Sequence, residues 1–533
     1  MNTLNDIADR EWEVLIIGGG IFGAAVARDA ALRGFKTALV ERNDFASATS
    51  SKSTKLVHGG IRYLEQLNFN LIHESLKERT TLLTIAPHLV RPLPFLLPIF
   101  KGERFPKPII QLGVWMYSRL AGKNSLRNYE SFSAREIKQK YPFLNEAETT
   151  GGIRYFDAQM DDIRLCLETI LSAQAEGAQT ANHVEVTRIG IRGDGKFEVS
   201  LQDRLTGTKG KARAVAVVNA SGPWADQILS LLLPRHKPML CLSKGIHLVV
   251  KQKISDDAVV LSSSDKRVIF AIPWRGGSIV GTTDTPYRDS LDEVWASEHE
   301  VEFLLNEVRK VTRSFHINRS DIITTFSGIR PLAALTGGKN TSKVSRSHVI
   351  HEAPKRFFSV VGGKYTTHRL IAEQVCNRLE KTFGKKRSSC KTALLPLLGS
   401  FDLPSQASAY NVHLDISGIN SHTLDYLMRT YGKRVKEVVQ IANRNPNLQR
   451  PICRYHSSIG AQIIFAIEQE SAKTLTDICV RRLRIDQTFC RGLDCIYPVA
   501  DFMAERLGWS ETKKISELRD YEIWVRKNTE CLT

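Results

Sequence analysis

A glycine-rich turn between an apolar run and a helix-prone segment is the feature that most constrains the fold. Gly18, Gly20 and Gly23 form a G-x-G-x-x-G motif at the end of the apolar run of residues 14–18. The first glycine suits a tight turn, the second lets the backbone approach a pyrophosphate, and the third lets the following helix pack closely on the strand. Phosphate is favoured there because a helix N-terminus presents N–H groups and a positive dipole end. The motif predicts a Rossmann-like unit with a helix over residues 24–32 and a second strand over 37–40.

The second predicted strand leads into an acidic residue. Glu41 follows Gly23 by eighteen residues, a position from which a carboxylate accepts hydrogen bonds from ribose hydroxyls. Because a carboxylate disfavours a 2′-phosphate there, NADP is not expected. No second G-x-G-x-x-G motif and no redox cysteine pair follow, which argues against a two-nucleotide reductase and a disulfide reductase. An NAD dehydrogenase and a flavoenzyme that oxidises its substrate directly remain.

The composition limits the class of protein. A chain of 533 residues predicts two to four domains, and 42% hydrophobic with 24% charged residues is an ordinary globular balance. The nine cysteines are odd in number and include no C-x-x-C pair, which favours a reducing compartment over a disulfide framework. No signal-peptide pattern and no apolar run of about 18 residues occurs. A net charge of +18 suggests either an anionic partner or simply a basic solvated surface.

Three regions beyond the glycine motif show distinct patterns. Residues 91–108 hold five of the nineteen prolines, which predicts an irregular apolar loop. Short β-type runs between residues 195 and 290 predict a substantial sheet. Apolar spacing predicts a separate C-terminal helical domain, with helices over residues 422–443, 459–484 and 512–527.

Six blocks of sequence carry a specific resemblance. They are ATSSKSTKLVHGGIRYLE (48–65), NASGPWAD (219–226), DKRVIFAIPW (265–274), VGTTDTPY (280–287), SGIRPL (327–332) and VGGKYTTHRLIAE (361–373). In these blocks and their order the chain closely resembles the FAD-dependent, quinone-linked glycerol-3-phosphate dehydrogenases, and RTYG (429–432) fits the C-terminal domain of that family. The resemblance favours FAD over NAD.

The resemblance implies both a fold and an activity. The fold is α/β: a Rossmann-like FAD-binding domain and an antiparallel-sheet substrate or cap domain, as in amino-acid-oxidase-like flavoproteins, plus a C-terminal α-helical domain. We expect the oxidoreductase body at residues 12–388, with the cap at 80–150 and 235–325, and the helical domain at 389–533. The implied reaction oxidises sn-glycerol 3-phosphate to dihydroxyacetone phosphate by hydride transfer to FAD, and a membrane quinone then takes the electrons.

Phosphate recognition calls for arginine, whose planar guanidinium donates two parallel hydrogen bonds to phosphate oxygens. Arg330 in SGIRPL matches a substrate arginine of the family, and Arg346 in VSRSH fits a second. Arg62 and Tyr63 in HGGIRYLE match further substrate positions. The stretch between Arg330 and Arg346 has no clear period, so spacing alone does not establish Arg346.

A base must take the proton of the C2 hydroxyl. His58 precedes two glycines that permit close backbone approach, and an imidazole with an ordinary pKa near 6.5 accepts a proton at neutral pH. Lys364 in GGKYTT competes for this role, or else stabilises negative charge on the reduced flavin. The choice between them stays open.

The resemblance also assigns cofactor contacts. Glycine, hydroxyl and backbone positions are expected to hold FAD: Gly18, Gly20, Gly23, Glu41, Thr49, Ser50, Ser51, Val186, Ala220, Ser221, Gly222, Gly362, Gly363, Lys364 and Thr366. No metal site is expected, because Cys453 and His456 are close in sequence but have no further ligands beside them.

Electron delivery to a quinone requires access to a bilayer. The run PLPFLLPIF (92–100), flanked by Arg91 and Lys101, either enters the interface of an anionic membrane or lies buried against the helical domain. We expect a cytoplasmic protein attached peripherally to the inner face of the membrane; homodimer formation is left open. Nucleic-acid binding is not expected, because the charge is dispersed and no recognition module is present.

Two rival functions remain. One is an α-glycerophosphate oxidase, which uses oxygen as acceptor; that family usually carries an extra insertion, for which 533 residues leave little room. The other is a non-catalytic flavoprotein that acts as a binding subunit. His58, Arg62, Arg330 and Lys364 argue against it, since a decayed site usually loses such groups.

Overall fold

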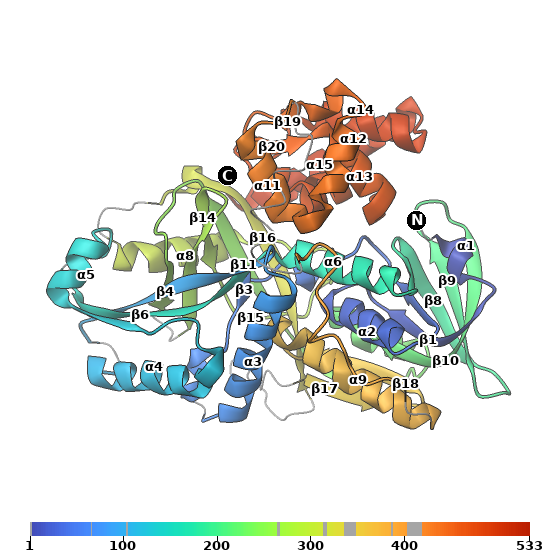
Figure 1. Cartoon of the computed structure of the whole chain (residues 1–533), viewed down its shortest axis with the longest axis horizontal. Coiled ribbons are helices and arrows are strands. Elements are labelled where there is room, and N and C mark those ends of the chain that lie inside the picture. The colour runs from blue at the N-terminus through green and yellow to red at the C-terminus, as the bar shows by residue number, and fades with distance from the viewer. Residues whose placement is uncertain are drawn as a thin grey trace.

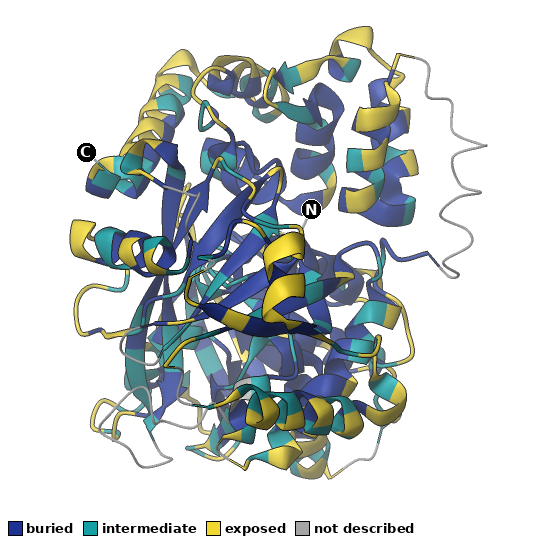
Figure 2. Cartoon of the chain, turned by 90° about the vertical axis from the view of Figure 1, so that its left-hand side faces the viewer, coloured by how far each residue is buried: buried dark blue, intermediate teal, exposed yellow. Residues whose placement is uncertain are grey.

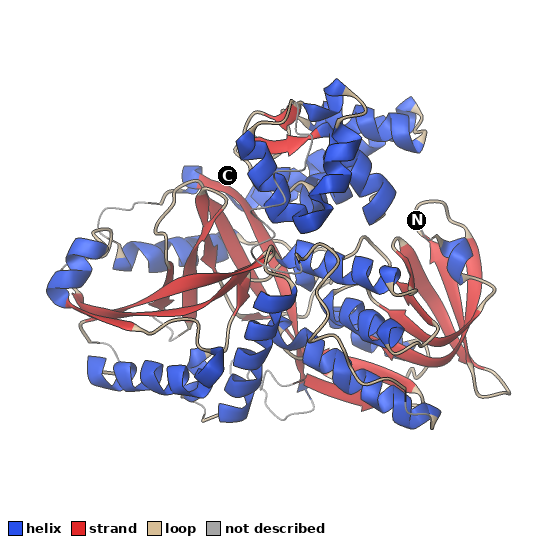
Figure 3. Ribbon diagram, viewed as in Figure 1, coloured by secondary structure: helices blue, strands red, loops and turns tan. Residues whose placement is uncertain are grey.

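Two sheets and a C-terminal group of helices build the molecule (Figure 1). The computed structural model describes residues 3–65, 67–102, 105–145, 147–263, 267–312, 317–334, 348–384, 387–401 and 418–532. Arg346 lies outside these residues, and the side chain of Arg62 is also not described. Figure 3 shows most of the strands in the lower half of the view, on its left and right sides, and mainly helices in the upper, C-terminal part.

Sheet A contains the glycine-rich turn. Its strands are β1 (Glu11–Ile17), β2 (Thr37–Val40), β7 (Gln179–Ala181), β8 (Val184–Ile191), β9 (Phe197–Asp203), β10 (Lys209–Asn219), β17 (His348–Glu352) and β18 (Phe357–Gly362). Parallel pairing joins β18, β10, β1, β2 and β7 in that order. Three helices cover one face through a shared apolar core: α2 (Ile21–Leu32), α6 (Asp162–Ala175) and α9 (His368–Phe383). The strand–helix–strand unit predicted around Gly18 is confirmed. Its strands are apolar because a strand inside a parallel sheet is buried on both faces.

Sheet B is mainly antiparallel. Its strands are β3 (Leu56–Val57), β4 (Val90–Phe100), β5 (Glu130–Ser133), β6 (Thr149–Met160), β11 (Leu240–Val250), β12 (Ala258–Ser262), β13 (Val268–Trp274), β14 (Gly277–Gly281), β15 (Thr285–Pro286) and β16 (Ile322–Ala333). Helices α3 (Phe69–Ile85), α4 (Lys107–Ala121), α5 (Ala134–Lys140) and α8 (Glu298–Val311) accompany it. Inner strands are buried and outer helix faces are exposed (Figure 2). The expected pair of a Rossmann-like domain and an antiparallel-sheet domain is therefore present, and the β-type runs between residues 195 and 290 divide between the two sheets.

The proline-rich run is not a loop, so the prediction for residues 91–108 is wrong. Strand β4 pairs with β6 along its whole length, from Val90 opposite Met160 to Phe100 opposite Thr149. The prolines of β4 are Pro92, Pro94 and Pro98. Backbone N–H groups of a strand point alternately to its two edges, so prolines at even spacing remove donors from one edge only. The remaining two, Pro106 and Pro108, lie at the start of α4, where a helix needs no N–H donor.

The C-terminal part is mostly helical, as predicted. It holds α11 (Ser421–Tyr431), α12 (Val435–Ala442), α13 (Gly460–Glu470), α14 (Ile496–Leu507) and α15 (Glu511–Thr529), with a hairpin of β19 (Pro451–Cys453) and β20 (His456–Ile459). Two of the three predicted helices are interrupted, at Gly432 with φ +55° and at Ser471 with φ +59°. In both, a residue with positive φ ends the helix, and at Ser471 it has the left-handed αL conformation. The third, over residues 512–527, is confirmed as α15.

Buried ion pairs attach this helical domain to sheet A. Asp44 accepts hydrogen bonds from Arg481 at 2.6 Å and from Arg482 at 2.8 Å, and all three residues are buried. Arg164 on α6 contacts Glu470 at 2.7 Å. Removing one partner of such a pair leaves an uncompensated buried charge, so these contacts strongly constrain how the domain docks.

Candidate active site

A cavity of about 410 Å³ lies where the two sheets meet. Sheet A lines it with the glycine-rich turn, the end of β2 and residues 220–222. Sheet B lines it with residues 245 and 247 of β11 and residues 328–332 of β16. The cavity therefore extends from a dinucleotide-type turn to the polar end of an antiparallel sheet.

The glycine-rich turn leaves no room for side chains. Gly18 has φ +112°, and a Cβ atom placed on it would lie 2.6 Å from the carbonyl oxygen of Ala220. A Cβ atom on Gly23 would overlap the carbonyl oxygen of Gly18, because α2 packs directly on the end of β1. The backbone N–H of Ile21 donates to Ser50 Oγ at 2.9 Å, which joins residue 50 to the start of α2. This close packing fits a turn that holds a pyrophosphate.

Glu41 lies beside this turn at the end of β2. Its Oε2 accepts a hydrogen bond from the N–H of Gly19 at 2.7 Å, and its Oε1 accepts one from Asn43 at 2.8 Å. Burial raises the pKa of this carboxyl, and the two backbone hydrogen bonds oppose the rise. Each carboxylate oxygen retains a second lone pair, so the group fits ribose hydroxyls.

Most of the expected cofactor positions line the same cavity. They are Gly18, Gly20, Glu41, Thr49, Ser50, Val186, Ala220, Ser221, Gly222, Gly362, Gly363, Lys364 and Thr366. Two lie behind the lining: Gly23 packs inside the turn, and the Ser51 hydroxyl donates to the carbonyl oxygen of Ala48 at 2.9 Å. Gly222 at φ +58° and Gly363 at φ +83° have backbone conformations that suit glycine. The chain thus offers a lining that fits FAD.

Arg330 lies at the sheet B end of the cavity, on β16. Its Nη2 donates to Thr282 Oγ1 at 2.7 Å and to the carbonyl oxygen of Thr283 at 3.0 Å. Its Nη1 lies 3.4 Å from Asp284 Oδ1. Gly245, on the paired strand β11, makes room for the guanidinium, since a Cβ atom there would lie 2.6 Å from Arg330 Cζ. These contacts hold the cation in place at the cavity wall.

His58, Tyr63 and Lys364 line the same cavity as Arg330. The N–H of His58 lies 3.3 Å from Thr366 Oγ1, and the imidazole lies edge-on to Phe270. The ammonium of Lys364 lies 3.9 Å from the centre of the Tyr63 ring and 3.1 Å from Ser75 Oγ. The ammonium therefore has a cation–π contact and a hydroxyl contact inside the cavity. The predicted base candidates and the substrate arginine therefore share one cavity.

His247 is a polar group of this cavity that the sequence analysis did not single out. Its Nε2 lies 3.0 Å from Thr54 Oγ1, and its ring stacks on Phe326 with centroids 4.7 Å apart. Burial, with help from Arg330 and Lys55, holds its pKa well below the ordinary value, so the ring is neutral. The available signal was a lone histidine within the apolar run GIHLVV of residues 245–250.

Comparisons with known proteins cover almost the whole chain. Residues 13–378 match the family model described as FAD dependent oxidoreductase, and residues 390–514 match the C-terminal domain of alpha-glycerophosphate oxidase. A glycerol-3-phosphate dehydrogenase of Synechocystis is 34% identical, with 99% of each chain covered. The mitochondrial glycerol-3-phosphate dehydrogenase of Rattus norvegicus is 35% identical, with 98% of this chain and 75% of that one covered.

Solved structures agree on the fold. A glycerol-3-phosphate dehydrogenase from Bacillus halodurans, complexed with FAD, superposes with a TM-score of 0.78 at 28% identity and covers 99% of this chain and 97% of its own. The L-alpha-glycerophosphate oxidase from Mycoplasma pneumoniae, at 17% identity, TM-score 0.55 and coverage of 71% and 96%, shares the fold alone.

Proposed function

The chain belongs to the FAD-dependent glycerol-3-phosphate dehydrogenases, and from that membership we propose that it oxidises sn-glycerol 3-phosphate to dihydroxyacetone phosphate and passes the electrons to a membrane quinone. The observation that carries the proposal is one cavity lined both by the glycine-rich turn and by Arg330, His58 and Lys364. A substrate bound between these groups has a phosphate-binding cation, a base and a cofactor within one enclosure.

Arg330 binds the phosphate dianion in this proposal. Its guanidinium is held by Thr282 and Thr283, so little side-chain entropy is lost when the substrate binds. A guanidinium donates to phosphate oxygens in a planar, bidentate geometry that lysine does not offer. The phosphate end of the substrate then lies at Arg330, and the C2 carbon lies farther from this residue.

His58 takes the proton of the C2 hydroxyl. A neutral imidazole accepts a proton at physiological pH, whereas an ammonium in its charged form has no lone pair to accept one. The contact of Lys364 with the Tyr63 ring supports this division, in which Lys364 supplies positive charge. FAD, when bound, supplies the hydride acceptor. His247, neutral and tied to Thr54, shapes the wall of the cavity beside Arg330.

Attachment to the membrane is best supported at α4. Its exposed apolar side chains are Ile109, Leu112 and Trp115, at 51%, 54% and 44% exposure, spaced so that they share one face. Arg119 lies against the Trp115 ring and adds positive charge. Apolar side chains beside basic ones suit the interface of an anionic bilayer. In Figure 1, α4 lies on the edge opposite the helical domain.

Two further observations bear on membrane attachment. Among the described residues, no helix combines the length and the apolar character that a bilayer span requires. The PLPFLLPIF run is strand β4, paired with β6 and β12 and largely buried, so it is neither an interfacial loop nor a loop against the helical domain. We therefore propose peripheral attachment through α4, on the inner face of the cytoplasmic membrane.

The test is anaerobic addition of sn-glycerol 3-phosphate to the purified, FAD-loaded chain while the visible spectrum is recorded. Bleaching of the flavin band, with dihydroxyacetone phosphate as product, is the expected result. Reoxidation by a soluble quinone much faster than by oxygen identifies a dehydrogenase, and the reverse order identifies an oxidase. A flavin band that stays oxidised contradicts the proposal and favours a non-catalytic flavoprotein.

A further inference from the structure

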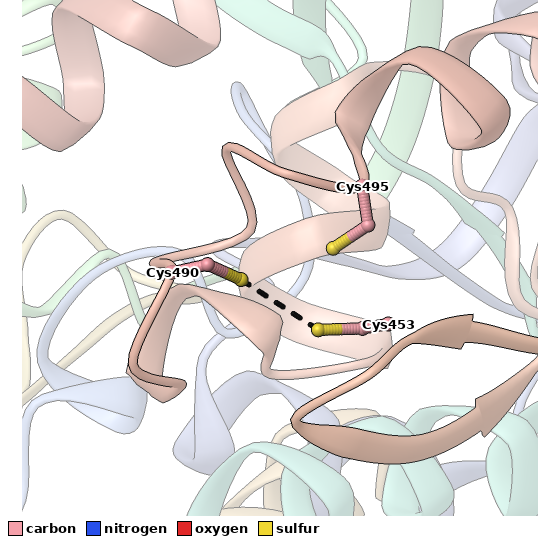
Figure 4. Close-up of side chains that lie close together, drawn as sticks. All are labelled: Cys453, Cys490 and Cys495. Atoms are coloured by element: carbon pink, nitrogen blue, oxygen red, sulfur yellow. Dashed lines mark hydrogen bonds between the residues drawn. The ribbon is translucent and has the colours of Figure 1, made fainter.

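Three cysteines converge inside the C-terminal helical domain (Figure 4). Cys453 ends strand β19, and Cys490 and Cys495 flank the loop that leads into α14. The three sulfur atoms all lie within 4.8 Å of one another, and Cys453 Sγ lies 3.6 Å from Cys490 Sγ. Figure 4 shows the three side chains pointing toward a common centre. None of the three lines the active-site cavity.

These separations suit a metal ion. Thiolates bound to tetrahedral zinc at about 2.3 Å have sulfur atoms about 3.8 Å apart. We propose that Cys453, Cys490 and Cys495 bind one Zn²⁺ ion, with water at the fourth position. Zinc, a borderline-soft cation, is a common partner of sulfur ligands. The ion would stabilise the domain by tying the β19–β20 hairpin to the start of α14.

Hydrogen bonds hold the loop that carries two of the proposed ligands in a defined shape. The N–H of Leu493 donates to the carbonyl oxygen of Cys490 at 2.9 Å, and that of Cys495 donates to Gly492 at 3.0 Å. Arg491 and Gly492 adopt positive φ values of 54° and 78°, which turn the chain back on itself. The Tyr521 hydroxyl holds the turn by donating to the carbonyl oxygen of Arg491 at 2.8 Å. A preformed loop reduces the ordering that metal binding requires.

The third thiol argues for a metal rather than a disulfide, because a disulfide between any two of these cysteines leaves the third without a role. His456, which is close to Cys453 in sequence, is engaged elsewhere: its Nε2 lies 3.0 Å from Arg275 and its Nδ1 lies 2.6 Å from Ser458. Cys453 and Cys495 are buried, while Cys490 is partly exposed and gives an entry path.

A second group of potential metal ligands differs from the cysteine cluster because it belongs to an ion-pair network. Asp44, His183 and Asp477 also bring three donor atoms within 4.8 Å of one another. Arg481 and Arg482 already neutralise these carboxylates, with contacts of 2.6 and 2.8 Å to Asp44. Two guanidinium groups at a site repel a cation, so this group carries no metal proposal.

The test uses the full-length, FAD-loaded chain, stripped of metal under reducing conditions and titrated with Co²⁺ and then Zn²⁺. We expect one ion per chain and a Co²⁺–thiolate absorption band that Zn²⁺ displaces. Cys453→Ser, Cys490→Ser and Cys495→Ser should each weaken Zn²⁺ binding by more than about 100-fold, because even partners outside the first coordination sphere contribute 10- to 100-fold. Cys241→Ser is the matched control, since it removes a partly exposed cysteine outside the cluster and should bind as the parent does.

A measurement on the parent chain covers the case in which a variant does not fold. Zn²⁺ should protect Cys490, the partly exposed member of the cluster, from alkylation, and mass spectrometry should identify it as the protected cysteine. Absence of a thiolate band, equal binding by the Cys453→Ser variant, or protection only of cysteines outside the cluster would each overturn the proposal. A disulfide within the cluster after purification without reductant, with no metal uptake after reduction, would overturn it in favour of redox chemistry.

Discussion

The hydroxyl of Thr49 donates a hydrogen bond of 2.7 Å to the carbonyl oxygen of Ile329, the residue before Arg330. The two residues are 280 positions apart in the chain. Thr49 begins the short helical turn beside the glycine motif, and Ile329 belongs to β16 of sheet B. The bond thus joins the cofactor side of the cavity to the strand that carries the phosphate-binding candidate, and it helps to set the distance between them.

Arg330→Ala should raise the KM for glycerol 3-phosphate by about 10- to 100-fold, because hydrogen bonds to charged groups contribute about 1.5–3 kcal/mol. The flavin content should not change, since Arg330 lies at the sheet B end of the cavity. Steady-state kinetics with a soluble quinone, together with the flavin-to-protein absorbance ratio, measure both. Arg135→Ala, an exposed arginine on α5, is the control. Unchanged kinetics in Arg330→Ala would remove this residue from the phosphate site.

Gly245→Ala should act on Arg330 indirectly. The added Cβ atom would lie 2.6 Å from Arg330 Cζ, and overpacking of this kind costs about 1–3 kcal/mol. We expect KM to rise about tenfold with FAD retained, because the guanidinium must move. Gly190→Ala on β8 has open space around its Cβ position and should leave KM unchanged. Equal effects in the two variants would mean that the change is not transmitted through Arg330.

His58→Gln should lower kcat by about 100-fold or more, the usual contribution of a general base, and should remove the acidic limb of the kcat/KM profile. Lys364→Met should keep that limb, because the lysine supplies charge rather than accepting the proton. The pH dependence of anaerobic flavin reduction in both variants is the measurement. If the limb disappears in Lys364→Met and persists in His58→Gln, the assignment is reversed.

Acid should destabilise the fold through His368, the first residue of α9. Burial lowers its pKa from 6.5 to about 4, and Nδ1–H donates to the carbonyl oxygen of Tyr365 at 2.7 Å. Between these two pH values the unfolded chain binds a proton that the folded chain does not. The contribution to the free energy of unfolding is therefore fully present above pH 6.5 and should fall by about 1.4 kcal/mol per pH unit down to about pH 4.

This dependence is measured by comparing His368→Asn with the parent in denaturant unfolding at pH 7, 6 and 5. The stability difference between parent and variant should shrink as the pH falls, whereas His299→Asn, an exposed histidine on α8, should track the parent. A difference that does not vary with pH would contradict the proposed role of His368.

Ile109→Glu combined with Trp115→Glu should weaken binding to vesicles that contain phosphatidylglycerol. Each fully buried apolar side chain contributes about 1.5–3 kcal/mol, so the double variant should bind at least about 100-fold more weakly. Ile191→Glu replaces a side chain that is 53% exposed on β8, outside α4, and should bind as the parent does. Vesicle sedimentation measures all three. Equal binding by the double variant and the parent would place the membrane contact elsewhere.

Local patterns predicted the parts of the fold in which neighbours in sequence interact. The turn at Gly18, the helix after it and the strand before Glu41 follow from short-range apolar spacing and glycine geometry. The same kind of argument was wrong for residues 92–100, because the prolines that suggested a loop align along one edge of β4 and leave the other edge free to pair with β6. A partner strand some fifty to seventy residues away decides that outcome, and local propensity does not include it.

The active-site side chains divide in the same way. Motif blocks predicted that Arg330, His58 and Lys364 belong to one pocket, and all three line the cavity. They did not point to His247, whose role depends on the stacking of Phe326 and on Thr54 from another part of the chain. Nor did they point to the cysteine cluster, since Cys453 and Cys490 are 37 positions apart.

The sequence by itself therefore determined the Rossmann-like unit, the family and FAD as cofactor, because a glycine turn and ordered motif blocks are encoded in contiguous residues. Only the tertiary structure decided that Gly245 makes room for Arg330, that Thr49 bonds to Ile329, and that Cys453 meets the loop of Cys490 and Cys495. Each of these depends on the distance between segments far apart in the chain. That distance is set by how the sheets and helices pack, which no local window of residues specifies.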